Sequence, residues 1–514
     1  MSILGVLGLG GRRTWRVGLG VMAAALVLSG VSWGATATYD PSTDLYSMYN
    51  LTSQMGAPAW WKAGYTGKGI DVAVIDTGVS PVQGLNGTGK VVYGPDLSLE
   101  SQAPKLRNLD TNGHGTFMAG LIAAHDSTLT APYGSAPASA YRGIAPDARI
   151  VSLKVATADG GVDVTQVIAA VDWVVQHAHD PGFNIRVINL SYGTNSTQAY
   201  DADPLAYAVE QAWKHGIVVV AAAGNTGYQK GHAAEGVADP AYDPYVIAAG
   251  GYDTKGTAAL SDDVLGLYSA GSSGCGGCKN PDFVAPGSHL QGLRDTGSYV
   301  DQNHPEGVIS TRYFRGSGTS EAAAVTSGVV ALILQKYPNL TPDAVKRFIA
   351  VNSRLIPSAS GKPQGAGEIY LTKLAGATPP VNYVQSFTNA TGIGSLELSR
   401  GTDHISLDGI ELIGSRDIFG HAFDAPGMAA DEAAASSWSG GMWNGSVWTG
   451  SSWSGSLWTS STWTGSSWSG SSWSGSTWSG NSWSGSSWSG SSWSGSSWSG
   501  SSWSGGVWAG GSWG

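Results

Sequence analysis

The middle of the chain alternates between short, mainly hydrophobic runs and longer amphipathic segments. Five hydrophobic runs stand out, at residues 72–75, 150–155, 185–190, 217–223 and 245–249. Runs of this length, bounded by polar and turn-forming residues, are typical of strands that are buried on both faces of a sheet. We therefore predict a strand at each of the five runs.

Amphipathic segments between these runs predict helices. Residues 165–179 place their apolar side chains on one stripe, and residues 204–215 form a second segment of this kind. Strands that alternate with helices indicate an α/β fold, in which helices cover both faces of a mainly parallel sheet. The alternation extends from residue 70 to about residue 352, which is enough chain to bury a large hydrophobic core.

Two further helices are predicted at the end of this region. Residues 320–337 are small or apolar on nearly every side, which indicates a helix buried within the fold. Thr341, Pro342 and Asp343 mark a helix start. Thr can cap free N–H groups, Pro suits the first helical turn, and Asp suits the positive end of the helix.

The periodic pattern weakens after residue 356. Residues 357–430 contain strand-like pieces at 393–398 and 404–412, and we predict a small β-rich appendage or linker there. A tail rich in Trp, Ser and Gly follows at 431–514, with a tryptophan at every fifth position from Trp438 onward. This series holds 16 of the 22 tryptophans and no charged residue, so the tail differs in kind from the rest of the chain.

Three interpretations of the tail remain open. A flexible linker is favoured by the entropy that so many Gly and Ser residues would lose on folding. A coil with five residues per side would bring all tryptophans to equivalent places, whereas one continuous strand would put alternate tryptophans on opposite faces. Contact with cell-wall or extracellular glycans is the third interpretation, because the aromatic rings offer a large apolar surface.

Residues 1–37 have the pattern of an export signal. Arg12, Arg13 and Arg16 precede an uncharged run at residues 17–33, and small residues at 35–37 supply a cleavage site. A membrane anchor is the alternative, although the run is at the short end of the ~17–25 residues that span a bilayer. We predict a secreted protein, with cell-surface association left open, and no membrane segment in the mature form. The arginines leave Sec and Tat export undecided.

Charge and cysteine content narrow the function classes. Only 12% of the residues are charged and the net charge is −10, which argues against nucleic-acid binding because such a surface needs a basic patch. The only cysteines, Cys275 and Cys278, are separated by two glycines. We favour a local disulfide between them, since export permits one. Free thiols or a metal contact are the alternatives, although a zinc site normally needs four ligands.

Three segments carry side chains suited to nucleophilic catalysis. Asp76 ends the predicted strand at 72–75, where its carboxyl group would be held rigidly. His114 lies between two glycines ahead of an apolar helical segment, and Ser320 opens the predicted buried helix. Acyl transfer needs a hydroxyl nucleophile, a base that takes its proton, and a group that orients the base. These three residue types match those roles.

Residues 64–352 resemble the subtilase family of serine peptidases. The resemblance rests on three motifs that occur in the family's order: Val74-Ile75-Asp76-Thr77-Gly78, Asn112-Gly113-His114-Gly115-Thr116 and Gly316-Ser317-Gly318-Thr319-Ser320. It implies a subtilisin-like three-layer sandwich around a seven-stranded, mainly parallel sheet. It also implies that Ser320 is the nucleophile, His114 the general acid and base, and Asp76 the group that orients His114.

Two further segments are similar to the family. Residues 220–225 resemble the segment that ends in the oxyanion asparagine, so Asn225 is expected to stabilise the tetrahedral oxyanion. Ser191, Tyr192 and Gly193 resemble the residues that pair with the substrate backbone and line the primary specificity pocket. Tyr192 is larger than the usual residue there. The resemblance thus predicts a secreted serine endopeptidase that cuts protein or peptide substrates through an acyl-enzyme.

The residues after the nucleophile depart from the family pattern. Glu321 and three alanines follow Ser320, where the family usually has Met, two Ala and Pro. Pro is favoured near a helix start but is not needed for the chemistry, and a negative charge suits the first helical turn. We therefore expect an active enzyme with an altered substrate preference on that side.

The peptidase domain is predicted at residues 38–356, and its first part is short. Residues 38–64 are too few for the folding propeptide that secreted subtilases often carry, so we expect Trp60 and Trp61 to pack this segment onto the core. No cofactor is required for the chemistry. Subtilases often bind structural calcium, but no ligand set can be assigned here residue by residue.

Two rival function classes remain. Asp295-Thr296-Gly297 repeats the Asp-Thr-Gly triplet at Asp76, and two such triplets could indicate an aspartic peptidase with paired carboxylates. The second triplet does not follow a buried strand, and the strand–helix alternation disfavours an all-β fold. The other rival is a catalytically inactive subtilase-like scaffold that serves as a surface adhesin, which the tail motivates and the complete set of catalytic residue types disfavours.

Overall fold

The computed structural model describes residues 39–448 apart from 104, 229–235, 273–277, 360, 403 and 408–409, and it also describes residues 512–513. The predicted export signal at 1–37 and the tail after residue 448, these two residues excepted, lie outside the described residues. The chain divides into a unit up to Tyr39 and a unit from Asp40 onward. Every helix and strand described belongs to the second unit.

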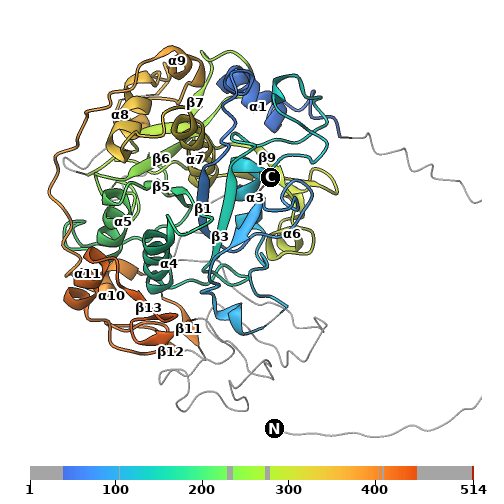
Figure 1. The fold of residues 1–514 in the computed structure, drawn as a ribbon. Helices are drawn as coiled ribbons and strands as arrows, with labels where there is room; N and C mark the ends of the chain where they lie inside the picture. Colours follow the sequence, from blue (N-terminus) through green and yellow to red (C-terminus); the bar gives the residue numbers. More distant parts are fainter. Residues whose placement is uncertain are drawn as a thin grey trace, which may run out of the picture. The chain divides into compact units, whose positions relative to one another are not determined.

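An eight-stranded sheet runs through this unit (Figure 1). Its order is β2-β3-β1-β4-β5-β6-β7, and β8 also pairs with β6. Every pairing is parallel except that of β7 with β6. The strands are β1 (Asp71–Asp76), β2 (Val91–Tyr93), β3 (Arg149–Lys154), β4 (Ile185–Leu190), β5 (Val218–Ala222), β6 (Ile247–Asp253), β7 (Val264–Leu265) and β8 (Phe283–Pro286).

The hydrophobic runs in the sequence are explained by burial in this sheet. The five predicted strands form β1, β3, β4, β5 and β6, which confirms the mainly parallel α/β fold. β1, β5 and β8 are buried along their whole length, so both of their faces need apolar side chains.

Helices pack against the sheet in two groups. α3 (His114–Ala123) packs on α7 (Thr319–Lys336), whereas α4 (Val164–His177) packs on α5 (Pro204–Lys214). Both groups also contact β1. α7 is buried from its first residue to Leu334, as its small and apolar composition predicts. No helix of the described residues is long and apolar enough to cross a bilayer.

Helix starts follow the capping rules. α8 (Pro342–Asn352) begins as predicted, with Thr341 accepting a hydrogen bond from the Ala344 N–H and Pro342 in the first turn. Asp163 caps α4 in a reciprocal arrangement with Gln166, whose side chain accepts from the Asp163 N–H. These caps fix where α8 and α4 begin, and the cap of α4 is a buried carboxylate.

The segment ahead of the sheet packs onto the core. α1 (Met48–Met55) and α2 (Ala57–Lys62) precede β1. The indole N–H of Trp60 donates to the Leu371 carbonyl at 2.9 Å, and that of Trp61 donates to the Ile144 carbonyl at 3.0 Å. Both side chains are buried, which confirms the role predicted for them.

A second, antiparallel sheet leads into α7. β9 (Leu290–Leu293) pairs with β10 (Tyr313–Ser317), and β10 also pairs with β16 (Ser512–Trp513). α6 (Tyr299–Asn303) lies in the connection between β9 and β10. Short 3-10 turns complete the elements up to residue 364, and these are η1 (Leu99–Gln102), η2 (Tyr133–Ser135), η3 (Pro305–Gly307) and η4 (Lys362–Gln364).

Residues 357–430 contain more helix than the sequence pattern suggests. Residues 393–398 were expected to be strand-like, but α10 (Leu396–Arg400) begins within them. Ser395 caps this helix by accepting from the Leu398 N–H, which favours a helical turn over a strand. The piece at 404–412 does form strands, β11 (Ser406–Leu407) and β12 (Ile410–Glu411). The other helices are α9 (Leu371–Gly376) and α11 (Ala425–Ala433).

The first repeats of the Trp-rich tail form a small three-stranded sheet. Its antiparallel strands are β13 (Trp438–Ser439), β14 (Met442–Trp443) and β15 (Ser446–Val447). The two-residue turns between them have positive φ throughout, at Gly440, Gly441, Asn444 and Gly445. Turns of this kind match the twist of a hairpin, and Asn-Gly is a strong signal for one.

These hairpins explain how a five-residue period keeps the tryptophans together. Trp438 lies directly opposite Trp443, and Trp448 follows two residues after the partner of Trp443. All three side chains are buried. The Trp438 indole N–H donates to the Ala169 carbonyl on α4 at 2.8 Å, so the small sheet packs against a helix of the main fold.

Candidate active site

Asp76 is the last residue of β1 and is completely buried. Its Oδ1 accepts a hydrogen bond from the Thr77 N–H at 2.7 Å. Gly78 then turns the chain with φ of 111°, a conformation that L side chains rarely adopt. The strand end thus presents a carboxyl group in a fixed orientation.

His114 is the first residue of α3 and lies against this carboxyl group. Its Nδ1 is 2.9 Å from Asp76 Oδ1 and 3.1 Å from Oδ2. Gly115 makes this approach possible, because a Cβ there would lie 2.1 Å from the Gly78 carbonyl oxygen and 3.0 Å from Asp76 Oδ1. Any larger residue at position 115 would push the His114 loop away from β1.

A second carboxyl group shapes the loop before His114. Asp110 accepts hydrogen bonds from the backbone N–H groups of Asn112, Gly113 and Thr116. The Thr77 hydroxyl donates to it as well, at 2.8 Å. The sequence motifs did not identify Asp110. Asp110 lies only four residues before His114 in the sequence. Its hydrogen bonds to the Asp76 motif, however, form only when the chain folds.

Burial and neighbouring charges act in opposite directions on the His114–Asp76 pair. Burial lowers the pKa of His114, but the charge and hydrogen bond of Asp76, together with the charges of Glu321 and Asp110, outweigh this and leave the pKa raised. Burial raises the pKa of Asp76, and the His114 contact and the Thr77 N–H oppose that rise. The site therefore favours the protonated imidazole when a proton becomes available.

Ser320 lies in the first turn of α7 and is buried. Gly318 before it is fully extended, with φ of 170°, and its N–H donates to the Gly287 carbonyl at 2.8 Å. α7 packs on α3, the helix that begins at His114, so the segments that carry Ser320 and His114 lie together. β1, α3 and α7 thus bring the three predicted catalytic residues into one region.

Asn225 is held next to the same helix start. Its Oδ1 accepts from the Thr319 N–H at 2.8 Å and from the Thr319 hydroxyl at 3.0 Å. An atom that accepts from a backbone N–H must be the amide oxygen, so the orientation of the side chain is determined. The amide NH₂ group is left to donate elsewhere.

The segment after β4 contacts α7 as well. The Ser191 hydroxyl donates to the Ser320 carbonyl at 3.3 Å and accepts from the Asn189 side chain at 3.0 Å. Gly193 allows a close approach to the next segment, because a Cβ there would lie 2.9 Å from the Asp239 carbonyl oxygen. The Tyr192 side chain is only 1% exposed, so this large residue belongs to the interior.

The second Asp-Thr-Gly triplet begins two residues after β9, which is a buried strand, so the expectation that it follows no buried strand was wrong. Asp295 accepts from the Ser80 hydroxyl at 2.6 Å, and burial followed by the charge of Asp110 raises its pKa to about 7. Asp76 instead pairs with His114. The paired carboxylates of an aspartic peptidase are therefore not formed by the two triplets.

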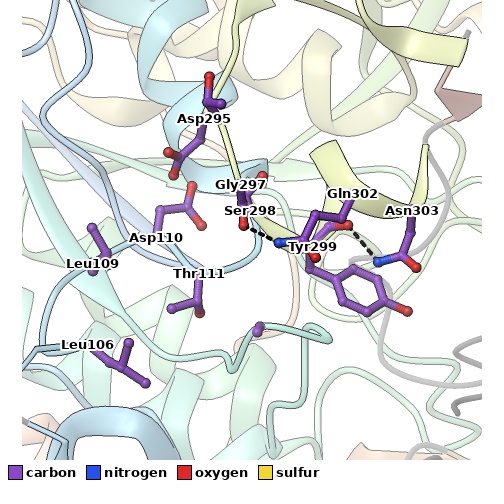
Figure 2. Close-up of a pocket in the computed structure, with 12 residues that line it drawn as sticks. Leu106, Leu109, Asp110, Thr111, Asp295, Gly297, Ser298, Tyr299, Gln302 and Asn303 are labelled. Atoms are coloured by element: carbon purple, nitrogen blue, oxygen red, sulfur yellow. Dashed lines mark hydrogen bonds between the residues drawn. The ribbon is translucent and has the colours of Figure 1, made fainter. Parts of the chain in front are cut away.

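A cavity of about 200 Å³ lies between the His114 loop and the α6 segment. Figure 2 shows Asp110 and Asp295 near each other on one side of it and Tyr299 on another. The Val300 N–H donates to the Asn112 carbonyl at 2.9 Å, so the α6 segment is tied to this loop. The motif search missed this cavity, because α6 bears no resemblance that we recognised.

The structure describes one of the two cysteines. Cys278 is disulfide-bonded, and its predicted partner Cys275 lies outside the described residues. Among the described residues no group of three or more His, Cys, Asp and Glu side chains could hold a metal ion. A structural calcium site is accordingly not assigned.

Comparisons with known proteins identify the family of this chain. The model of the Subtilase family matches residues 67–378. The chain therefore belongs to the subtilase family, a family of serine-type peptidases.

Several characterised relatives are similar over the peptidase region. Serine protease AprX of Bacillus subtilis (strain 168) is 36% identical over 55% of this chain and 61% of its own length. Subtilisin DY of Bacillus licheniformis is 32% identical over 56% of this chain and 84% of its own length. Minor extracellular protease Epr of Bacillus subtilis (strain 168) is 31% identical over 58% of this chain and 37% of its own length. The chain thus spans less than two thirds of the length of AprX and Epr.

Solved structures also match part of this chain. The crystal structure of a cold adapted subtilisin-like serine proteinase matches with 26% sequence identity and a TM-score of 0.42. The match covers 60% of this chain and 88% of that one.

Proposed function

We propose that this protein is a secreted serine endopeptidase in which Ser320, His114 and Asp76 form the catalytic triad. The observation that carries the proposal is the buried contact between His114 Nδ1 and the Asp76 carboxyl group, 2.9 Å long. Family membership supplies the reaction class, and the contact supports the proposal because a triad needs this relation between its histidine and its acid.

The geometry suggests how each residue acts. Asp76 accepts a hydrogen bond from the Nδ1–H group of His114, which leaves Nε2 as the basic nitrogen. His114 then takes the hydroxyl proton of Ser320 as the oxygen attacks the substrate carbonyl carbon. The tetrahedral intermediate collapses when the amine leaves with that proton, and an acyl-enzyme remains. Water attacks the acyl-enzyme with His114 again acting as base, and Ser320 is regenerated.

Asn225 is the proposed donor for the oxyanion. Its amide oxygen is occupied by Thr319, so the NH₂ group is available to a substrate. The backbone N–H of Ser320 would be the second donor, since the first turn of a helix has N–H groups without intrahelical partners. Donors that are already oriented need no reorganisation as charge develops, which is why they accelerate acyl transfer.

Ser191, Tyr192 and Gly193 are proposed to receive the substrate backbone. They continue β4 directly beside the carbonyl of Ser320, so an extended peptide could pair with them. The proposed substrates are therefore proteins or peptides, bound through their main chain. The buried Tyr192 side chain should restrict the space beneath that strand.

Secretion is proposed from residues 1–37, and the tail is proposed to contact cell-wall or extracellular glycans through its later tryptophans. The first three tryptophans of the series are buried in the small sheet and are not available for such contact. Deletion of residues 449–514 tests the glycan proposal. It should abolish retention on cell-wall material, and unchanged retention would refute it.

Hydrolysis of denatured casein is the decisive experiment for the proposed function. The secreted protein should degrade casein and react with a fluorophosphonate probe, and both properties should be lost in Ser320→Ala. A folded protein that neither cleaves casein nor labels would contradict the proposal. It would favour the alternative of a binding scaffold that has lost catalysis.

A further inference from the structure

Glu321 is a buried carboxyl group beside the proposed nucleophile. It follows Ser320 directly in α7, and its side chain is only 1% exposed. Neither carboxylate oxygen has a hydrogen-bond partner among the described residues. A carboxyl group in this situation loses its hydration without replacement, which is costly unless a nearby charge or a bound proton compensates.

Three titratable groups from three other segments face Glu321. His114 at the start of α3 and Asp76 at the end of β1 both interact with it electrostatically, and so does Tyr268 in the segment after β7. Asp110 acts on His114 from the loop before α3. His114 is thus the only group among these that can carry a positive charge; it contacts Asp76 directly, and its helix α3 packs on α7, which carries Glu321.

The titration behaviour agrees with this placement. Burial raises the pKa of Glu321 to about 7, with the charge of His114 opposing the rise and that of Asp76 adding to it. Asp76 and then Glu321 raise the pKa of His114, against the effect of burial. Glu321 therefore changes its charge in the pH range in which a histidine base becomes active.

We propose that Glu321 is a positioning residue for catalysis. Its carboxylate, in addition to that of Asp76, stabilises the imidazolium form of His114. The inference rests on the proposed function, because it concerns the proton that His114 takes from Ser320. It differs from the altered substrate preference expected from the sequence, since it concerns the reaction and not the choice of peptide.

One charge has two opposite effects in this arrangement. In the resting enzyme an ionised Glu321 favours imidazolium, so a higher pH is needed before His114 can act as base. In the transition state His114 becomes imidazolium, and the same charge lowers the barrier. Removal of the charge should therefore extend activity to lower pH and reduce it at high pH.

The test is the pH dependence of kcat/KM in Glu321→Gln, which keeps the shape of the side chain and removes its charge. Peptide hydrolysis by the full-length secreted protein is measured from pH 5 to pH 10. The mutant should be at least as active as the unmodified protein near pH 6 and about threefold to tenfold less active near pH 9, since a tenfold change corresponds to one pKa unit of interaction. Glu321→Met, with the residue usual in the family, should behave in the same way.

Glu210→Gln is a matched control. Glu210 is also a buried helical glutamate, but it lies on α5 and its Oε2 pairs with Lys214 at 3.2 Å. Its replacement removes the same formal charge and should leave the shape of the pH profile unchanged. Thermal unfolding of each variant verifies that the protein is folded.

The outcomes separate this inference from the proposed function. A crossing of the two profiles supports the role of Glu321. An unchanged profile, or a uniform loss at every pH, would overturn it, because both would mean that Glu321 only fills space. If the unmodified protein fails to label with the fluorophosphonate probe, the proposed function itself is wrong.

Discussion

Arg400 Nε donates to Asp163 Oδ2 at 2.6 Å, and both side chains are 0% exposed. Asp163 is also the cap of α4, so one carboxylate serves a helix of the peptidase region and a guanidinium of the segment after it. Arg400 also donates to Asp163 Oδ1, to Glu397 Oε2, and to the carbonyl groups of Gly414 and Arg416. The chain beyond residue 357 is thereby joined to the fold through a buried ion pair.

We predict that Arg400→Met lowers the free energy of unfolding by about 3–5 kcal/mol, because loss of one partner leaves a buried charge uncompensated. Urea denaturation measures this effect. Lys255→Met is the control, since the Lys255 side chain is 49% exposed and its pair with Asp253 should contribute at most about 1 kcal/mol. Equal effects of the two substitutions would show that the Arg400 pair is not dehydrated.

Asn225→Ala should reduce kcat without much change in KM, because the donor acts mainly on the developing oxyanion. A subtilisin that lacks the corresponding donor loses about 10²–10³-fold in kcat, and we expect the same order here. Steady-state hydrolysis of a peptide anilide gives both constants. A rise in KM at constant kcat would assign Asn225 to substrate binding instead.

Gly115→Ala should inactivate the enzyme, because its Cβ would lie 2.1 Å from the Gly78 carbonyl oxygen. The His114 loop must then move from β1, and a displacement of about 1 Å at a catalytic group can cost about 10²-fold in rate. Gly376→Ala is the control, since a Cβ there meets no atom within 4 Å. Retention of full activity in Gly115→Ala would mean that the loop can yield at no cost.

The stability of the small tryptophan sheet should depend on pH. Burial raises the pKa of Asp172 to about 7 and, assisted by Asp172, raises that of Glu432 well above its usual value. The Trp443 indole N–H donates to Asp172 at 2.7 Å. The folded state binds these protons more tightly than the unfolded chain does. The contribution of these groups to the free energy of unfolding is therefore highest below about pH 4 and falls as the pH rises toward about 7.

Asp172→Asn tests this dependence, because an amide oxygen can still accept from Trp443 and cannot ionise. Urea unfolding at pH 5 and pH 8 should show a smaller difference for the mutant than for the unmodified protein. A difference of the same size in both proteins would mean that other groups dominate this range.

The sequence allowed the prediction of those parts that depend on local pattern. β1, β3, β4, β5 and β6 were visible as hydrophobic runs because buried parallel strands need apolar side chains on both faces. Asp76, His114, Ser320 and Asn225 were visible because short motifs surround them, and the fold brings their segments to one region. The start of α8 was visible from its capping residues.

Long-range pairing was not visible in the same way. Nothing near Arg400 in the sequence indicates that its partner is Asp163, and nothing near Asp110 indicates that it bonds to Thr77. The strand-like piece at 393–398 was misread because Ser395 caps a helix there. The Trp-rich hairpins were not predicted, although Asn444-Gly445 is a hairpin signal. A five-residue period matches neither the strand period of two nor the helix period of 3.6.

The ion pair between Arg400 and Asp163 also sets an order of events during synthesis. The two residues are separated by 237 positions, so a growing chain that already contains Ser320 and all of α7 still lacks the partner of a buried charge. The peptidase region can reach its full stability only after the ribosome has added the segment that carries Arg400. Completion of the catalytic residues therefore precedes completion of the fold that holds them.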